Sequence, residues 1–380
     1  MKQKPVRFSD TSKVLGGVAF IGGIGAGILG LPFAIAKVGL PLGIPYIIAI
    51  GLLMMGVNLL IGEIIIRTKK NLQLAGLART YIGKWGEGVM VFLTYTLLFA
   101  VLLIYIIGEG QALAALFGGS AYNWSVGFFV CASILVIVGM KMIQRIDILL
   151  LFLLTLIVSI IIGNGFLHIH PASLQYTNWG NFFLPYGVLI FSFHATAAVP
   201  EAFDVVEKKS ALFRRAIIAS GVFNIIVYIF FAIATVGVLG VDTTAIATIG
   251  LGEKIGQHIL VFGNIFAVIA MGLSYLNCAS TIRDSLTWDF KINPALGATI
   301  ACLIPFGLFV WGMRGFIETI DVVGGVFMSV ELLLLLYIYW KVEHLKRKSP
   351  DYMVHHAIWL FILLILAFSV GTVYSVVKLF

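Results

Sequence analysis

Long apolar runs separated by short charged segments dominate the pattern of hydrophobic and polar positions. Many approach or exceed the roughly 20 residues that an α-helix needs to cross a bilayer. They predict eleven membrane-spanning helices at 14–36, 40–62, 89–108 (continuing to about 117), 122–140, 148–167, 181–200, 216–240, 257–281, 294–311, 317–340 and 357–377. The ten-residue alternation of a transmembrane β-barrel does not describe these runs. We therefore expect an all-α integral membrane protein with a single transmembrane domain.

The composition supports a membrane location. Of the 380 residues, 61% are hydrophobic and 11% are charged, with a mean hydropathy of +1.07. About 25% of residues are charged in soluble proteins. The net charge of +8 is interpreted as anchoring of cytoplasmic segments rather than as nucleic-acid binding. The first run is too long for a cleavable signal peptide. We expect a multi-pass protein of the plasma membrane.

The basic residues predict the orientation. Lys and Arg concentrate in the N-terminal segment and in every second connection, the bias expected of cytoplasmic loops. Of the 25 basic residues, only Lys37, Lys254, Arg314 and Lys378 fall on the opposite face. An incorrect number of spans would destroy this alternation. The N-terminus is therefore predicted in the cytoplasm and the C-terminus outside.

Several classes of function are not expected. The longest connections, about 67–88 and 341–356, are too short for a soluble domain, and no HExxH, paired-Asp or GxSxG motif is present. The cysteines, Cys131, Cys278 and Cys302, lack metal-ligand spacing and are interpreted as buried free thiols. We expect neither an enzyme nor a metal or cofactor, and no obligate protein partner.

Two of the predicted spans carry helix-breaking residues near their middle. The first contains "FIGGIGAGILGLPFAIAK" (20–37), and the sixth contains "VLIFSFHATAAVPEAFD" (188–204). Unwound backbone at the membrane midplane exposes N–H groups that can hold a carboxylate and carbonyl groups that can hold a cation. The alternative is close helix packing, because Gly23 and Gly27 have GxxxG spacing.

The spacing of the breaks indicates two repeats. Five spans precede the second break, and an odd number of spans inverts the second half relative to the first. This pattern is typical of inverted-repeat transporters. We expect a first repeat at 14–167, an inverted second repeat at 181–340 and an extra helix at 357–377.

These segments resemble a known family. "GAGILGLPFAIAKVG" (25–39), "LLIGEIIIRTKKNLQLAGLARTYIGKWG" (59–86) and "FSFHATAAVPE" (191–201) are similar to the first, second and sixth helices of the amino acid/auxin permease family. That family belongs to the amino acid–polyamine–organocation superfamily and includes bacterial tyrosine and tryptophan permeases and animal neutral amino-acid transporters. The resemblance covers most of the chain. It implies a leucine-transporter-type 5+5 inverted repeat plus one helix, and an amino-acid substrate.

The resemblance also implies a binding site. It assigns substrate contacts to both breaks: Gly25, Ala26, Gly27, Ile28, Ser192, Phe193, His194 and Thr196. "LSYLNCASTIRD" aligns with a family segment that contributes a hydroxyl to a sodium site, which places Ser274 there. Sodium-coupled members carry an asparagine where this chain has Ile21. The difference favours protons as the coupling ion, with sodium as the alternative.

Ionisable and polar groups within the spans have two interpretations each. His194 carries a coupling proton or bonds to substrate, or it caps freed carbonyls as a neutral ring. Glu331 carries protons, or it is a protonated structural link. Tyr105 reaches the substrate carboxylate or packs between helices. Glu109 is expected in a vestibule or in solvent rather than in coupling.

Charged residues at the predicted cytoplasmic ends have structural interpretations. Glu63 precedes Arg67 by four residues and is expected to form an i,i+4 ion pair. Three further acids precede a basic cluster at 208–215 and are expected to form loop or gate salt bridges: Glu201, Asp204 and Glu207.

Together these features predict a secondary active amino-acid transporter. The expected mechanism is proton symport by alternating access, with substrate held at the two breaks. A sodium-coupled symporter and an exchanger of amino acids or polyamines remain alternatives. The broken portions themselves contain no acid, which argues against a cationic substrate.

Overall fold

The computed structural model describes residues 8–22, 26–68, 72–138, 147–344 and 357–378, and every regular element in them is helical. The elements are α1 (Phe8–Ile21), α2 (Gly27–Val38), α3 (Leu40–Thr68), α4 (Leu74–Tyr81), α5 (Lys84–Phe117), α6 (Ala121–Val138), α7 (Asp147–Phe166), η2 (Pro171–Leu174), η3 (Trp179–Asn181), α8 (Pro185–Phe193), α9 (Ala198–Val205), α10 (Ser210–Leu239), η4 (Gly240–Asp242), α11 (Ala247–Ile255), α12 (Gln257–Phe290), α13 (Pro294–Trp311), α14 (Phe316–Val322), η5 (Val323–Met328), α15 (Ser329–His344) and α16 (Ala357–Val377). The element η5 is a π-helix that joins α14 to α15.

The helices follow the predicted spans closely. Within the described residues, 9 helices are long and apolar enough to cross a membrane. The first predicted span appears as α1 and α2, and α7 stands where the fifth was expected. The ninth and eleventh have the bounds predicted from the sequence. The prediction of an all-α membrane protein is confirmed.

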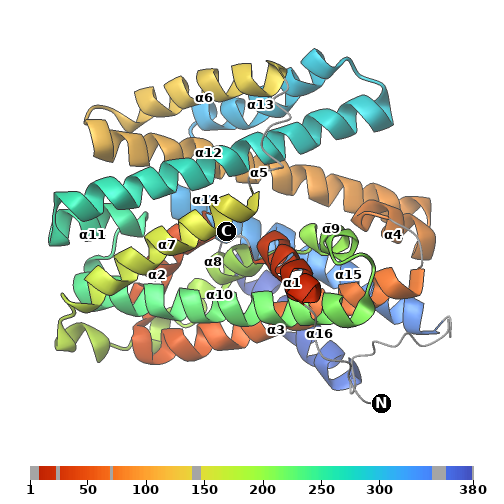
Figure 1. The fold of residues 1–380 in the computed structure, drawn as a ribbon, viewed down its shortest axis with the longest axis horizontal. Coiled ribbons are helices and arrows are strands. Elements are labelled where there is room, and N and C mark those ends of the chain that lie inside the picture. The colour runs from red at the N-terminus through yellow and green to blue at the C-terminus, as the bar shows by residue number, and fades with distance from the viewer. Residues whose placement is uncertain (1–7, 23–25, 69–71, 139–146, 345–356, 379–380) are drawn as a thin grey trace.

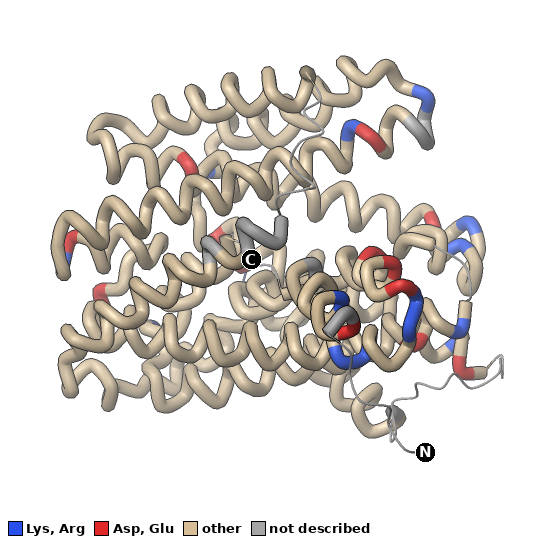
Figure 2. The backbone as a smooth tube through the Cα atoms, viewed as in Figure 1, with Lys and Arg blue, Asp and Glu red and all other residues tan. Residues whose placement is uncertain are grey.

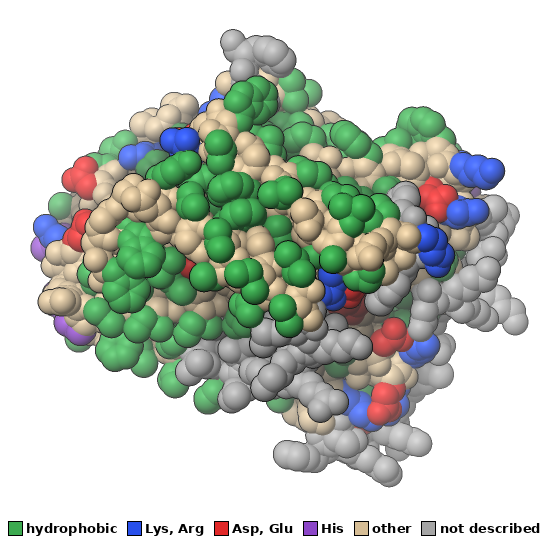
Figure 3. All heavy atoms as spheres, turned by 90° about the horizontal axis from the view of Figure 1, so that it is seen from above, with side chains coloured by type: hydrophobic (Ala, Val, Ile, Leu, Met, Phe, Trp, Pro, Cys, Tyr) green, Lys and Arg blue, Asp and Glu red, His purple; other side chains and the backbone are tan. Residues whose placement is uncertain are grey.

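The long helices run side by side along the longest axis of the molecule (Figure 1). Lys and Arg gather toward the end where α4 and α9 lie, while the middle of the backbone carries few charges (Figure 2). Apolar side chains cover the middle of the face seen in Figure 3, with charged groups toward both ends. This distribution matches a bilayer around the middle of the molecule and water at the ends.

Two layers of helices enclose the broken ones. In one layer α5 packs along α12, with α6 and α13 beside them; in the other, α10 packs against α3. The short helices α2 and α8 lie between these layers and contact each other (Figure 1). The layers therefore hold the breaks in the interior, away from lipid.

The cysteine prediction was partly wrong. Cys302 is buried and Cys278 is partly buried, but Cys131 is exposed on α6. Most of the α6 surface is accessible, because this helix lies at the edge of its layer. In a membrane protein such a surface faces lipid, which an apolar run in the sequence does not distinguish from the interior.

Candidate functional site

The first break lies between α1 and α2. Gly25 falls outside the described residues, while Ala26, Gly27 and Ile28 are all buried. Ala26 is the N-cap of α2 and offers no side-chain hydrogen bond. The first N–H groups of an α-helix have no partner within the helix, and the helix dipole makes this end attractive to anions. A buried and uncapped helix start is therefore suited to a carboxylate.

The second break lies between α8 and α9. The backbone turns to an extended conformation at His194, with a ψ of 119°. The Tyr228 hydroxyl of α10 donates to the Ser192 carbonyl at 2.8 Å, and the Ser192 hydroxyl donates to the Val188 carbonyl at 2.7 Å. Tyr228 thus satisfies a carbonyl at the end of α8. The sequence did not indicate this role for Tyr228, which appears there only as a hydroxyl-bearing residue within an apolar run.

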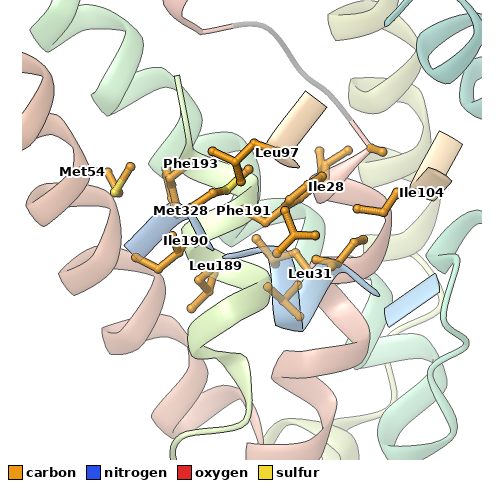
Figure 4. Close-up of a cluster of buried hydrophobic side chains, with 14 of the residues drawn as sticks. Ile28, Leu31, Met54, Leu97, Ile104, Leu189, Ile190, Phe191, Phe193 and Met328 are labelled. Carbon is orange, nitrogen blue, oxygen red and sulfur yellow. The ribbon is translucent and has the colours of Figure 1, made fainter. Parts of the chain in front are cut away.

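The two breaks meet in space. A Cβ atom added at Gly27 would lie 2.6 Å from the Ser192 Cα atom, so only glycine permits this approach. Figure 4 shows Ile28 and Leu31 of α2 beside the α8 residues, with Ile104 of α5 on the far side of α2. The start of one half-helix and the end of another are therefore brought together within an apolar surround.

A polar cluster lies at the second break. His194 Nε2 is 2.6 Å from Glu331 Oε2 of α15 and 3.0 Å from the Thr196 hydroxyl. The Thr196 hydroxyl also donates to the same Glu331 oxygen, at 3.4 Å. The Thr196 side chain is fully buried, and the side chains of Glu331 and His194 are 2% and 13% exposed. This arrangement can hold one proton between a base and an acid inside the membrane.

The π-helix η5 precedes Glu331 and packs against α8. A Cβ atom on Gly324 of η5 would collide with the Gly187 carbonyl oxygen, so these backbones are in direct contact. The Ser329 hydroxyl donates to the Gly324 carbonyl at 3.0 Å and lies 2.8 Å from the Tyr186 hydroxyl of α8. π-Helical turns recur at functional sites. Here the turn and its hydrogen bonds fix α15 beside the second break.

The remaining predicted residues lie nearby in two places. The Phe193 ring is 4.8 Å from the Tyr228 ring, centroid to centroid, and packs toward Gly51 of α3. Tyr105 of α5 is buried and its side chain lies toward Ser274 of α12. Ile21 is buried at the end of α1 and has an apolar side chain. The structure thus connects Tyr105 with Ser274, and separately connects His194, Thr196 and Glu331.

The expected ion pairs at the charged end are present. Arg67 and Glu63 form the predicted i,i+4 pair, and the Tyr339 hydroxyl of α15 donates to Glu63 at 3.5 Å. Lys13 lies 2.7 Å from Glu207. The hydrogen bond from Lys13 lowers the pKa of the Glu207 carboxyl.

The same loop contains a second predicted contact, since Lys208 lies 3.5 Å from Asp204. The interpretation of these residues as loop salt bridges is confirmed for Asp204 and Glu207.

The expectation for Glu109 was wrong. Its side chain is fully buried, with 0% exposure, rather than in a vestibule or in solvent. Its run continues well beyond it, and α6, α12 and α14 all pack against α5. The sequence around Glu109 does not indicate that other helices bury this residue.

An all-helical membrane fold with two broken helices that meet in its interior defines a transporter of the leucine-transporter type. The structure of MhsT in complex with L-phenylalanine has the same fold: the TM-score is 0.72 and the similarity covers 100% of both chains, at 12% sequence identity. The chain belongs to the tryptophan/tyrosine permease family, whose model matches residues 10–376. The resemblance seen in the sequence is thereby confirmed, and the protein is a multi-pass permease rather than an enzyme.

A curated relative agrees with this assignment. Glutamine transporter 2 of Aliivibrio fischeri (strain ATCC 700601 / ES114) is 26% identical over 319 residues, which are 76% of this chain and 81% of the relative. The family and the fold together support secondary amino-acid transport.

Proposed function

We propose that this permease is a proton-coupled symporter of neutral amino acids that binds its substrate between the two breaks. The observation that carries the proposal is the His194–Glu331 contact of 2.6 Å at the second break. It places a titratable pair beside the segment where a transporter of this fold has its substrate site. Proton binding and substrate binding then occur at one location.

The substrate α-carboxylate is assigned to the start of α2. Ala26, Gly27 and Ile28 offer backbone N–H groups there, and Ala26 leaves the helix start without a side-chain cap. The positive end of the helix dipole adds an attraction for a negative group. Gly25, which was predicted to share this role, lies outside the described residues.

The substrate side chain is assigned to the end of α8. Ser192, Phe193 and Thr196 are the predicted lining residues, and Tyr105 of α5 is a further predicted contact. Phe191 and Phe193 make this end of α8 apolar, and both are largely buried. These surroundings favour an uncharged side chain, because a buried charge needs a partner. Glu331 is the nearby acid, and His194 and Thr196 already contact it.

The coupling ion is assigned as a proton. His194 and Glu331 together can bind a proton when the site faces one side of the membrane and release it on the other. The apolar side chain of Ile21 cannot coordinate sodium. Alternating access would then move the α1–α2 and α8–α9 segments against the layer of α5 and α12, in keeping with two inverted repeats at 14–167 and 181–340.

Uptake into proteoliposomes tests the proposal. A panel of all common amino acids is offered with an inward proton gradient, with an inward sodium gradient, and with neither. We expect concentrative uptake of one or a few neutral amino acids that needs the proton gradient and is abolished by a protonophore. Uptake that survives the protonophore but requires sodium would assign coupling to sodium, in which Ser274 was the predicted ligand.

Two variants with matched controls locate the coupling site. His194→Gln and Glu331→Gln should abolish accumulation driven by the proton gradient. His168→Gln and Glu343→Gln should not, because both of these residues are exposed and Glu343 is on the same helix as Glu331. If uptake needs no gradient and occurs only against an internal amino acid or polyamine, the protein is an exchanger of the same fold.

A further inference from the structure

Glu109 lies in the second half of α5, eight residues before the helix ends at Phe117, and has no partner for its charge among the described residues. The side chain is 0% exposed, and among the described residues neither carboxyl oxygen has a hydrogen-bond partner. The other deeply buried acids differ in this respect, since Glu63 pairs with Arg67 and Glu331 pairs with His194. Glu109 is not used by the mechanism proposed above.

The glycines on either side of Glu109, Gly108 and Gly110, allow neighbouring helices to pack closely around it. A Cβ atom at Gly108 would collide with Met271 of α12 and Phe316 of α14, and one at Gly110 would collide with Ser125 of α6. Side chains of α12 and α14 therefore pack directly on the α5 backbone at Gly108, and α6 does so at Gly110. The Ser125 hydroxyl donates to the Ile106 carbonyl at 2.8 Å, so it does not serve the carboxyl.

A third glycine makes room for the carboxyl itself. A Cβ atom at Gly272 of α12 would lie 3.1 Å from Glu109 Oε1 and 3.8 Å from the Phe128 ring. The carboxyl thus occupies the space that a side chain on α12 would fill. The result is a closed site shaped around one acid by α5, α6 and α12.

The titratable groups on the surrounding helices do not neutralise Glu109. Tyr275 of α12 stacks edge-on against Phe128, and its hydroxyl lies toward Ser133 and Cys302. On α5 itself, Tyr105 is directed to Ser274 of α12.

The acids of α14 are Glu318, which is exposed, and Asp321, which lies 2.6 Å from Lys378. Asp284 of α12 pairs with Arg283 at 2.7 Å, and Glu87 of α5 pairs with Arg79. No cation is recorded in contact with Glu109 among the described residues. An ionised carboxylate inside a membrane protein needs a partner or water, whereas a protonated carboxyl avoids that cost.

We propose that Glu109 is a proton-binding site of the α5–α6–α12 layer, distinct from the His194–Glu331 pair. It holds a proton in the conformation seen here and exchanges it only when α12 moves away from α5 and water reaches the carboxyl. The three glycines make this dependence steep, because the surrounding groups pack directly on them and a small separation of the helices opens these contacts to water.

Infrared spectroscopy of the full-length protein in lipid nanodiscs at neutral pH tests the proposal. We expect the C=O stretch of a protonated carboxylic acid in the wild type and its loss in Glu109→Gln. The band should persist in Glu331→Gln and in Glu87→Gln, a control on the same helix whose acid is paired with Arg79. A wild-type spectrum without this band, or a Glu109→Gln spectrum in which the band keeps its wild-type intensity, would overturn the proposal.

A second measurement uses the wild type alone and so does not depend on a variant that folds. After transfer to D₂O, the downshift of the band reports exchange of the Glu109 proton. Exchange should be slow at rest and many-fold faster during turnover with substrate on both sides. Equally fast exchange at rest would show that water already reaches the site. The band reports whether Glu109 is protonated and does not require transport. The proposal for Glu109 can therefore be tested even if the proposed proton symport is wrong.

Discussion

Two buried regions of this protein each contain an acid, and they treat it in opposite ways. At the breaks, Glu331 of α15 meets His194 and Thr196. In the α5–α6–α12 layer, Glu109 is enclosed, and its carboxyl has no hydrogen-bond partner in the part of the chain that the structure describes. The difference shows that irregular backbone can bring polar partners to a buried acid. The end of α8 presents His194 and Thr196 from a segment that is not helical, whereas continuous helices around Glu109 present glycines and apolar side chains.

Gly27→Ala probes the break region most strongly. The added methyl group would lie 2.6 Å from the Ser192 Cα atom, so α2 and α8 must separate. Overpacking of this kind costs about 1–3 kcal/mol. Since about 1.4 kcal/mol is a tenfold change in an equilibrium constant, substrate binding should weaken roughly tenfold or more. Gly307→Ala on α13 is the control, since nothing lies near its added methyl group. Equal binding by both variants would show that the breaks need not touch.

Substitution of each acid by leucine, which has a similar volume, compares the two regions directly. Glu331→Leu removes the buried carboxyl that both His194 and Thr196 contact and should lower the free energy of unfolding by about 1–3 kcal/mol. Glu109→Leu removes a group with no partner and should change it by less than about 0.5 kcal/mol or raise it. Chemical denaturation in detergent measures both. A larger loss for Glu109→Leu would reverse the comparison.

A pair of tyrosines sharpens the comparison at a smaller scale. Tyr228 and Tyr275 are both fully buried; the Tyr228 hydroxyl donates to the Ser192 carbonyl, whereas the Tyr275 hydroxyl has no hydrogen-bond partner among the described residues. Tyr228→Phe should weaken substrate binding or folding by about 1 kcal/mol, because it leaves that carbonyl unpaired. Tyr275→Phe should leave both unchanged, as judged by the KM for uptake and the melting temperature. A similar loss in the two variants would contradict the assignment.

The Lys13–Glu207 pair extends the comparison to a solvent-exposed acid. Removing this pair should change stability less than any of the destabilising substitutions above. Lys13 lowers the pKa of Glu207 in the folded protein. The pair therefore stabilises the fold at pH values above the ordinary carboxyl range, and this contribution is lost as the pH falls through the lowered value. The difference in melting temperature between wild type and Lys13→Gln should vanish in acid and shrink in high salt. A difference that is independent of pH would exclude the ion pair as its cause.

Hydrophobic pattern predicted most of the fold. Helix α13 begins at Pro294 and ends at Trp311 as expected, because apolar runs and flanking breakers determine a membrane helix locally. The breaks were also predictable, since glycine and proline weaken helices wherever they stand. The π-helix η5 was not predicted. It depends on the contact between Gly324 and Gly187, which belong to different predicted spans.

The sequence singled out individual residues of the candidate site but not how they are arranged. His194 and Glu331 each stood out as polar groups within apolar spans, yet their contact joins positions 137 residues apart. Glu109 shows the converse. Its sequence context suggested a position near the surface, and its burial arises from the next helix, α6, together with α12 and α14, which are distant along the chain. The sequence of one span shows which polar groups are unusual within an apolar run. Their contact partners are determined by how the spans pack together.

The central claim is that the His194–Glu331 pair carries the proton that moves with substrate. The most direct test is proton influx driven by substrate alone, recorded with a pH-sensitive dye inside proteoliposomes that have no initial ion gradient. Addition of the transported amino acid should acidify the lumen with the wild type and with Glu343→Gln, but not with Glu331→Gln. Acidification by Glu331→Gln at the wild-type rate would contradict the claim.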